Sequence, residues 1–238
     1  MKTLSIVIPC YNEESTIGEL LDRVLAVALP GWNKEVIVVD DCSKDGTRAI
    51  LKGYESRIKV IYQEKNGGKG TAVRRGLSEA SGDHALIQDA DLEYDPADIP
   101  RLLAKIDGGA ADVVFGSRNL DPQGRRGGLI PYLGASLITL ELNLLYGLAL
   151  TDACTCYKLF PAATAPDFGT GGFESELVFT AELARRGYRF AEAPISYDPR
   201  DVAHGKKIRY RDGVQAIIAI LADWLRHGRR VTEGDERN

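Results

Sequence analysis

The chain has few cysteines, and they show neither a metal-binding pattern nor a disulfide framework. Cys10, Cys42, Cys154 and Cys156 include no C-x-x-C pair, and none has a histidine partner at the spacing of a zinc site. Buried, reduced thiols in a cytosolic protein are the simpler explanation for so small a set. We therefore expect a cytoplasmic protein with free cysteines.

An excess of positive charge is also missing. The chain carries 30 Lys and Arg residues against 34 Asp and Glu, a net charge of −4, which argues against a general nucleic-acid binder. The opening stretch MKTLSIVIPCYNEE has too short an apolar run, and turns acidic too soon, for a signal peptide. The negative net charge therefore predicts that the protein has no nucleic-acid partner. Internal repeats and low-complexity segments are also absent from the sequence, so no fibrous or repeat architecture is expected.

What the chain does contain is a regular alternation of strand-like and helical stretches. Apolar, β-branched runs predict strands near residues 4–8, 35–39, 58–62, 84–88 and 112–115. Helical spacing predicts helices between them, near residues 15–28, 45–54, 69–80 and 95–106. Strands without polar alternation, separated by helices, indicate an α/β fold with a mostly parallel sheet covered on both faces. In such a sheet, ligands bind beyond the carboxyl ends of the strands.

Two long apolar stretches follow residue 116. Residues 130–150 carry one charge, Glu141, which approaches the composition of a membrane span, but Pro131, Gly134 and Asn143 weaken that interpretation. A buried helix or one lying on a membrane surface is favoured. Residues 210–225 predict a second helix with a broad apolar face that packs on the core. The polar end of the chain, residues 229–238, is expected to be a flexible tail.

The stretch LIQDADLEYDP, residues 86–96, places four carboxylates directly after a predicted strand. If the chain stays extended there, Asp89, Asp91 and Glu93 point to one side, and their repulsion requires a compensating cation or solvent. Oxygen ligands of this kind suit Mg²⁺ or Mn²⁺, which also bind substrate phosphates. Asp95, followed by a proline, is instead a plausible N-cap of the next helix.

Four more motifs stand at predicted strand ends: IPCYNEE, VVDDCSKDGT, NGGKGTAVRRG and GSR. Together with QDADLEYDP, and in this order, they resemble the inverting family 2 glycosyltransferases, and most closely the dolichyl-phosphate and polyprenyl-phosphate sugar synthases. The resemblance covers roughly residues 3–215. It implies a GT-A fold in one catalytic domain, residues 1–228, with a nucleotide-sugar-binding half (1–118) and an acceptor-binding half (119–228).

The resemblance and the residue chemistry together predict a donor site for a nucleotide-diphosphate sugar of the GDP-mannose or UDP-glucose type. Tyr11 can stack on the base, and Asn12 or Glu13 can hydrogen-bond the ribose. Asp40 and Asp41 offer acceptors to base N–H groups, and the resemblance favours Asp41. Lys69 can meet a phosphate or the ribose. The predicted donor residues are Pro9, Tyr11, Asn12, Glu13, Asp40, Asp41, Lys69, Gly70, Asp89, Ala90, Asp91 and Lys206. Helix capping is the alternative role for Asp40 and Asp41.

By the same resemblance, Asp89 and Asp91 bind a divalent metal ion, Mg²⁺ or Mn²⁺, together with the diphosphate. The third ligand in the resembled family is often a Gln two residues later, and here that position is Glu93. The extra carboxylate should strengthen ion binding, and it departs from the ligand set of the synthases. Asp91 is accordingly also counted among the catalytic residues.

A lipid-phosphate acceptor is already anionic and needs arginines to position it rather than a base. Arg118 and Arg126 (or its neighbour Arg125) are the predicted positioning residues, and Arg200 belongs to a segment that resembles the family's diphosphate lid. That lid contains the densest basic cluster of the chain, which comprises Arg200, Lys206, Lys207, Arg209 and Arg211.

Two other functions stay open from the sequence. If the acceptor is a saccharide or small-molecule hydroxyl, a carboxylate must take its proton, and Asp152, Glu174 or Glu176 are the candidates. A non-catalytic nucleotide-sugar binder is the third, less favoured, interpretation. With a polyprenyl-phosphate acceptor, the two apolar helices would meet the lipid tail or the membrane surface, which implies peripheral contact with the cytoplasmic face of a membrane.

Overall fold

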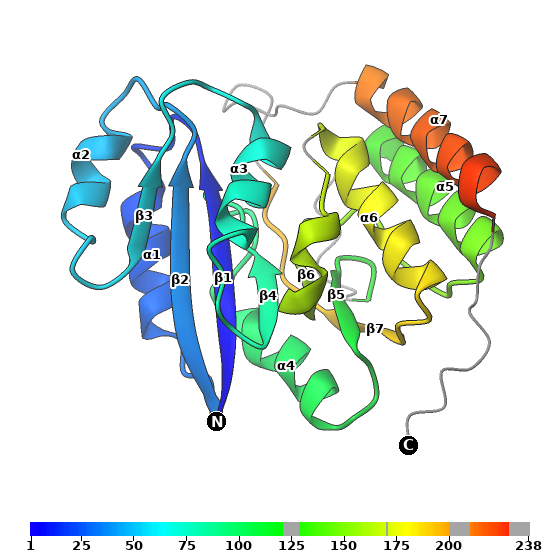
Figure 1. Cartoon of the computed structure of the whole chain (residues 1–238), viewed down its shortest axis with the longest axis horizontal. Coiled ribbons are helices and arrows are strands. Elements are labelled where there is room, and N and C mark those ends of the chain that lie inside the picture. The colour runs from blue at the N-terminus through cyan, green and yellow to red at the C-terminus, as the bar shows by residue number, and fades with distance from the viewer. Residues whose placement is uncertain (121–128, 170, 200–209, 229–238) are drawn as a thin grey trace.

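The computed structural model describes residues 1–120, 129–169, 171–199 and 210–228. In these residues, seven strands form one sheet in the order β3-β2-β1-β4-β6-β5-β7 (Figure 1). The strands are β1 (Lys2–Cys10), β2 (Trp32–Asp40), β3 (Lys59–Tyr62), β4 (His84–Ile87), β5 (Val113–Ser117), β6 (Lys158–Pro161) and β7 (Phe190–Pro194). The α-helices are α1 (Ile17–Ala26), α2 (Thr47–Lys52), α3 (Lys69–Leu77), α4 (Ile99–Asp107), α5 (Leu129–Tyr146), α6 (Phe173–Arg185) and α7 (Tyr210–His227).

The prediction of a mostly parallel sheet is confirmed. β1 pairs in parallel with β2 and β4, β2 with β3, and β5 with β7, whereas β6 runs antiparallel to both of its neighbours, β4 and β5. β6, β7 and α6 were not predicted as elements. β6 is only four residues long, and β7 has the weak strand sequence FAEAP, so neither has a distinctive hydrophobic pattern.

Helices cover both faces of the sheet, as predicted. Along β1, Leu4, Ile6 and Ile8 pack in one cluster with α1 and α4, while Val7 packs in a second cluster with α3, α5 and α6. Successive side chains of a strand point to opposite faces, so a strand covered on both faces is apolar throughout. In Figure 1, α3 and α6 lie in front of the sheet and α1 lies behind it.

The element boundaries agree with the sequence to within a few residues. Asp95 is the N-cap of a short 3-10 turn, Pro96–Asp98, and its carboxylate accepts the Ala97 N–H at 2.9 Å, which confirms its predicted capping role. The helix expected at residues 130–150 is α5, and it ends at Tyr146, just before Gly147 with its positive φ of 70°. None of the helices in the described part of the chain combines the length and hydropathy that a membrane-spanning segment requires.

A close approach between α3 and the sheet depends on Gly76. A Cβ atom at this position would meet Val7 Cγ1 at 2.4 Å and Val39 Cγ2 at 3.1 Å, both within the tightly packed core. We therefore expect Gly76→Ala to lower the free energy of unfolding by about 1–3 kcal/mol, as overpacking does. Gly213→Ala in α7, where no atom lies within 4 Å, should instead be neutral or slightly stabilising. Urea denaturation of both variants measures the difference, and equal stabilities would contradict this account of α3.

Candidate active site

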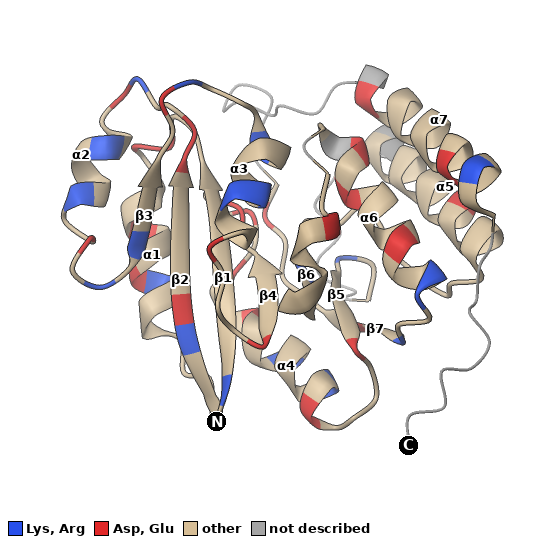
Figure 2. Ribbon diagram, viewed as in Figure 1, with Lys and Arg blue, Asp and Glu red and all other residues tan. Residues whose placement is uncertain are grey.

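The carboxyl ends of the parallel strands meet at one edge of the sheet, and the loops that leave this edge carry the predicted site residues. Figure 2 shows acidic residues at the upper end of β2 and in the adjoining loops. In the described residues, positive φ outside glycine occurs at Asn12, Cys42 and Leu92, one in each of the loops that follow β1, β2 and β4. Such conformations are sparsely populated and concentrate at functional sites.

The acidic loop after β4 is a turn, so the expectation of an extended chain there was wrong. Leu92 has a φ of 64°, and Asp91 Oδ1 accepts the Glu93 N–H at 3.2 Å. Glu93 Oε2 accepts the hydroxyl of Tyr197 at 2.9 Å. No group of three or more potential ligand residues gathers in a metal-binding arrangement within the described ranges. Glu93 was predicted as a third metal ligand because an extended chain would place it on the same side as Asp89 and Asp91. The turn removes that geometric reason.

Lys69, the first residue of α3, connects the acidic loop to α6. Its ammonium lies 2.8 Å from Asp89 Oδ1 and 3.2 Å from Glu176 Oε1, and Cys156 Sγ is 3.0 Å away. Burial alone would lower the pKa of Lys69, but the neighbouring anionic groups, Asp89 first, raise it well above its ordinary value. Burial alone would raise the pKa of Asp89, and the Lys69 ammonium holds it below its usual range. Both groups are therefore charged at neutral pH.

Asp40 and Asp41 end β2 and organise the loops around them. Asp40 is fully buried and accepts Arg48 Nε of α2 at 2.5 Å. Asp41 accepts the backbone N–H groups of Gly67 and Gly68 at 2.8 and 2.7 Å, so it shapes the glycine loop that leads into α3. These contacts are loop-supporting rather than helix-capping, and the predicted contact of Asp41 with the base stays a prediction.

The loop after β1 lies beside the loop after β2. Pairing of β1 continues through Pro9 to Cys10, so the strand extends beyond the predicted residues 4–8. Asn12 Oδ1 accepts the Lys44 N–H at 2.8 Å, and the Asn12 N–H donates to Ser43 Oγ at 2.9 Å. Glu13 is buried at 6% exposure. The structure thus assigns Asn12 a loop-supporting contact, and the ribose contact expected of it or Glu13 stays untested, as does the stacking role of Tyr11.

Arg118 follows β5 and is held on two sides. It forms a bidentate ion pair with Asp152, Nε to Oδ2 at 2.6 Å and Nη2 to Oδ1 at 2.8 Å, and its guanidinium lies 5.0 Å from the ring centre of Tyr197. Glu192 of β7 accepts the backbone N–H of Asp152 at 3.0 Å and so anchors the chain at this residue. A planar guanidinium held in this way is preoriented for an oxyanion ligand.

The three carboxylates considered as bases all have other partners. Asp152 accepts Arg118, and Glu176 Oε2 lies 3.3 Å from Lys158 Nζ while its other oxygen faces Lys69. Glu174 Oε1 accepts the N–H of Gly172 at 2.8 Å in the turn that begins α6. Each of these carboxylates is therefore already bound to a cation or to a backbone N–H group, and the observed contacts do not orient any of them toward an acceptor hydroxyl.

Several predicted residues cannot be placed. Those that lie outside the described residues are Arg125, Arg126, Arg200, Lys206, Lys207 and Arg209, together with the side chain of Arg211. Gly70 and Ala90 are described and buried, on the same segments as Lys69 and Asp89. Of the predicted donor residues, the structure brings Lys69 of α3 into contact with Asp89 of the loop after β4, and Asp91 stands in that same loop.

Sequence reasoning missed several residues that build the site. Tyr197, Cys156 and Lys158 contact predicted site residues, and Tyr94 stacks on Tyr157 with ring centres 5.5 Å apart. The sequence contained little indication of these residues, because each of them lies in a short segment without hydrophobic periodicity. A lysine in the apolar stretch CYKLF, as Lys158 is, was the one available indication of a buried ion pair.

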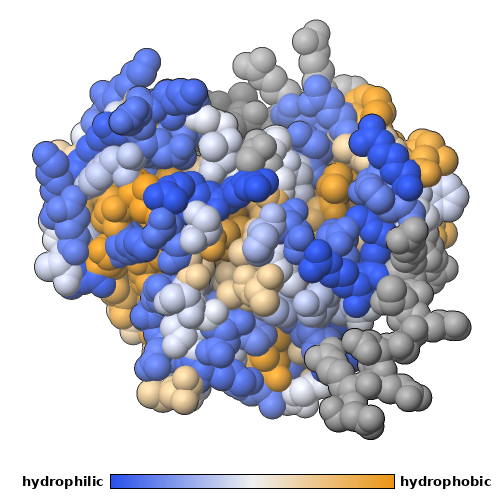
Figure 3. Space-filling model, in the orientation of Figure 1, coloured by the Kyte–Doolittle hydropathy of each residue, from blue (hydrophilic) through white to orange (hydrophobic). Residues whose placement is uncertain are grey.

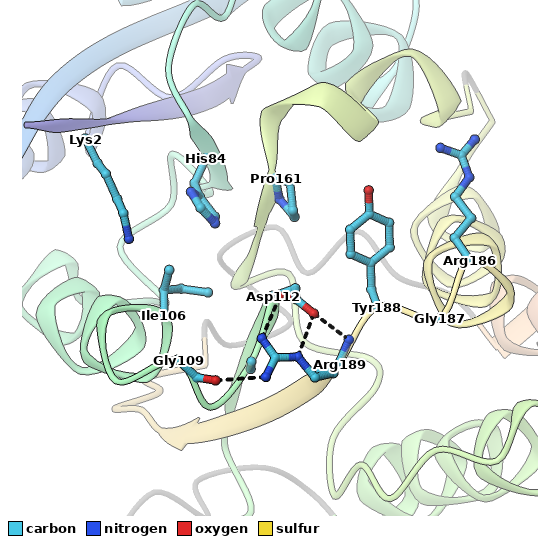
Figure 4. Close-up of a pocket in the computed structure, with 11 residues that line it drawn as sticks. Lys2, His84, Ile106, Gly109, Asp112, Pro161, Arg186, Gly187, Tyr188 and Arg189 are labelled. Carbon is cyan, nitrogen blue, oxygen red and sulfur yellow. Dashed lines mark hydrogen bonds and ion pairs between the residues drawn. The ribbon is translucent and has the colours of Figure 1, made fainter. Parts of the chain in front are cut away.

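A cavity lies at the opposite edge of the sheet from this site, and Figure 4 shows residues that line it. It has a volume of about 480 Å³ and is lined by Lys2 of β1, His84 of β4 and Pro161 of β6, among others. Its cationic groups already have carboxylate partners; for example, Arg189 pairs with Asp112 at 2.9 Å. The cavity lies at the amino ends of β1 and β4, where a parallel sheet does not place its ligand.

The residues at the carboxyl edge fit a hard divalent ion. Asp89 and Asp91 would supply carboxylate oxygens, and the side chain of Asp89, which is 14% exposed, lies beside a cation, the Lys69 ammonium. Two carboxylates leave coordination positions for diphosphate oxygens and water, which is how Mg²⁺ is usually held at phosphate sites.

Comparison with known families identifies the chain. The model of the family described as glycosyl transferase family 2 matches residues 5–163, which include the loops after β1, β2 and β4. The chain belongs to glycosyl transferase family 2. This is the family that the motifs at the strand ends predicted, and the sheet and helices of the chain form a GT-A fold.

Curated relatives include sugar transferases that act on lipid phosphates. The chain is 43% identical over 117 residues to a dolichol-phosphate mannosyltransferase of Pyrococcus furiosus, a match that covers 48% of this chain and 33% of that protein. It is 30% identical over 204 residues to a low-salt glycan biosynthesis hexosyltransferase of Haloferax volcanii, covering 84% of this chain and 48% of the relative. The chain thus spans a third to about half of the length of these two relatives.

A solved structure confirms the fold. Glucosyl-3-phosphoglycerate synthase from Mycobacterium tuberculosis, in complex with Mn²⁺, uridine diphosphate and phosphoglyceric acid, aligns with a TM-score of 0.71 and 22% identity. The alignment covers 93% of this chain and 78% of that one. Another structure of the same synthase contains Mg²⁺ and uridine diphosphate. Because the sequences are only 22% identical, the likeness establishes the fold alone, and that fold is GT-A.

Proposed function

We propose that this glycosyltransferase moves a hexose, with inversion and with a divalent ion, from a nucleotide-diphosphate sugar to a polyprenyl phosphate. The observation that carries the acceptor class is the set of partners of the candidate bases. Asp152, Glu174 and Glu176 are each engaged by a cation or a backbone N–H. An acceptor hydroxyl needs a base, whereas a phosphate oxygen is already anionic at neutral pH. The name of the dolichol-phosphate relative supports the same acceptor class.

The donor would bind at the carboxyl edge of β1, β2 and β4. A divalent ion held by Asp89 and Asp91 would supply charge stabilisation for the departing diphosphate. Lys69 would donate to a diphosphate oxygen, and Asp41 would keep the glycine loop in place through the N–H groups of Gly67 and Gly68. Arg118, preoriented by Asp152, would hold the acceptor phosphate so that its oxygen faces the anomeric carbon.

The apolar helices α5 and α7 provide a surface for the lipid. α5 exposes Leu133, Leu137, Leu140 and Leu144, and α7 exposes Val214, Ile218, Leu221 and Leu225, each at 44–71% exposure. In both helices the spacing is four, three and four residues, so each set forms one stripe along its helix. Figure 3 shows hydrophobic residues gathered at the upper right, where α5 and α7 lie in Figure 1. Large exposed apolar patches mark interaction sites, and these two stripes are the candidates in the described residues.

The lipid contact can be tested on α5. We expect the double variant Leu137→Glu/Leu144→Glu to lose binding to phosphatidylcholine vesicles that contain undecaprenyl phosphate, because two charges would enter the apolar phase. Gln215→Glu adds a charge at an exposed polar position of α7 and serves as the matched control. Vesicle flotation measures the binding. Unchanged flotation of the double variant would remove this surface from the proposal.

The function itself is tested by turnover. UDP- and GDP-sugars are supplied with undecaprenyl phosphate or with water-soluble saccharides, with and without Mn²⁺, and the glycosylated product is measured. Product formed on the lipid phosphate only when the ion is present supports the proposal. Turnover restricted to saccharide hydroxyls would support the rival acceptor, and donor binding detected by a raised melting temperature without any turnover would indicate a non-catalytic binder.

A further inference from the structure

The ammonium of Lys69 lies between two carboxylates that come from different parts of the fold. Asp89 in the loop after β4 is 2.8 Å away, and Glu176 in α6 is 3.2 Å away. Their side chains are 14% and 6% exposed, whereas the Lys69 side chain is 39% exposed. The two acids are therefore held within the protein, and the lysine reaches them from the solvent side on a flexible stem.

The two carboxylates differ in what compensates their charge. Glu176 has a second cation, Lys158, whose side chain is 2% exposed and whose Nζ lies 3.3 Å from Oε2. For Asp89, the ion pair found among the described residues is the one with Lys69. If Lys69 left Asp89, the Asp89 carboxylate would need another cation, whereas Glu176 would keep Lys158. Of the two contacts, the one with Asp89 is therefore the one that an incoming cation can replace.

We infer that Lys69 occupies the place of the divalent ion at Asp89 until the donor binds, and that Glu176 is the positioning residue that keeps Lys69 beside the site afterwards. This inference rests on the proposed function, because it requires an ion and a diphosphate at Asp89 and Asp91. An ion and an ammonium on the same carboxylate repel each other, and the diphosphate removes that repulsion by offering Lys69 new oxygens. Metal and diphosphate thus bind cooperatively, and the ion alone binds weakly.

The test measures Mn²⁺ binding to the full chain rather than activity. Free Mn²⁺ is counted by electron paramagnetic resonance in titrations with the ion alone and with UDP or GDP present. We expect Lys69→Met to bind Mn²⁺ alone about fivefold more tightly, the equivalent of a partly exposed ion pair, and to bind it less tightly than wild type when the diphosphate is present. Lys65→Met removes an exposed lysine from the same loop and should match wild type in both titrations.

Glu176→Gln tests the positioning role separately. In this variant Lys69 keeps Asp89 as its carboxylate partner, so Mn²⁺ alone should bind more weakly than to wild type. The increase in Mn²⁺ affinity on adding the diphosphate should also be smaller than in wild type. A merely structural role for Glu176 would lower the melting temperature without changing the ratio of the two Mn²⁺ affinities. Circular dichroism confirms that each variant is folded.

The possible failures can be told apart. If folded Lys69→Met binds Mn²⁺ alone no more tightly than wild type, the replacement of the ion by Lys69 is wrong even when wild type binds Mn²⁺ with diphosphate as proposed. If Glu176→Gln behaves as wild type in both titrations, its positioning role is wrong. If wild type itself binds no Mn²⁺ with either diphosphate, the metal-dependent function is overturned, and this inference with it.

Discussion

Asp91→Ala is expected to reduce metal-dependent glycosyl transfer by about 10²–10³-fold or more while the protein stays folded. Asp91 lies in the turn after β4 rather than in the core, and its Oδ1 accepts the Glu93 N–H at 3.2 Å. Losing that hydrogen bond costs about 1 kcal/mol of stability. Losing the carboxylate removes one of the two groups proposed to hold the ion against the diphosphate, so the catalytic loss should far exceed the structural one.

A nearby carboxylate supplies the control for Asp91→Ala. Asp95 belongs to the same acidic stretch, but its side chain caps the turn Pro96–Asp98 through the Ala97 N–H. Asp95→Ala should therefore cost about 1 kcal/mol of unfolding free energy, as the loss of an N-cap does, and leave turnover close to wild type. Rates with saturating Mn²⁺, together with melting curves, separate the two effects. Normal turnover in Asp91→Ala would remove the site assignment.

Arg118→Ala is expected to weaken use of the acceptor far more than binding of the donor. The guanidinium is preoriented by Asp152 and Tyr197 on the β5 side of the site, whereas Lys69, Asp89 and Asp91 belong to the donor side. We expect the KM for polyprenyl phosphate to rise about 10²-fold, which corresponds to the loss of a charge-assisted bidentate contact, while the Kd for the nucleotide sugar changes little. Steady-state kinetics and calorimetry give the two values.

Removing Arg118 also leaves Asp152 buried at 2% side-chain exposure without its cation, which can cost about 3–5 kcal/mol. Arg118→Lys keeps the positive charge but not the bidentate geometry, so it should fold and show an intermediate rise in the acceptor KM. Arg23→Ala removes an arginine of α1 whose side chain and whose partner, Glu19, are both exposed, and it serves as the control. Equal losses of acceptor use and donor binding in Arg118→Lys would contradict the assigned role.

The strands and the order of the motifs could be predicted because their signals are local. An uninterrupted apolar run such as SIVIP or EVIVV indicates a strand buried on both faces, and polar residues mark where it ends. Parallel neighbours then carry Asp40, Asp41, Asp89 and Asp91 to the same edge of the sheet without further assumptions. The N-cap at Asp95 was predictable for the same reason, since the cap and the following proline are adjacent.

The conformation of the acidic loop could not be predicted from its own residues. Gln88 Nε2 donates to the carbonyl oxygens of Asp89 and Tyr94, each at 3.2 Å, and Tyr94 is stacked on Tyr157 from a segment far along the chain. These contacts favour a turn with Leu92 at positive φ over the extended chain that alternation suggests. The contact of Glu93 with Tyr197 depends on the same long-range packing.

The sequence by itself determined the family, the alternation of strands and helices, and the edge of the sheet where the acidic residues stand, because each depends on neighbours within one segment. The tertiary structure alone decided which charges compensate one another. Lys69 meets Asp89 and Glu176, and Arg118 meets Asp152, only because separate loops converge there. Ion pairs depend on distance in space, and spacing along the chain does not encode that distance for residues in different elements.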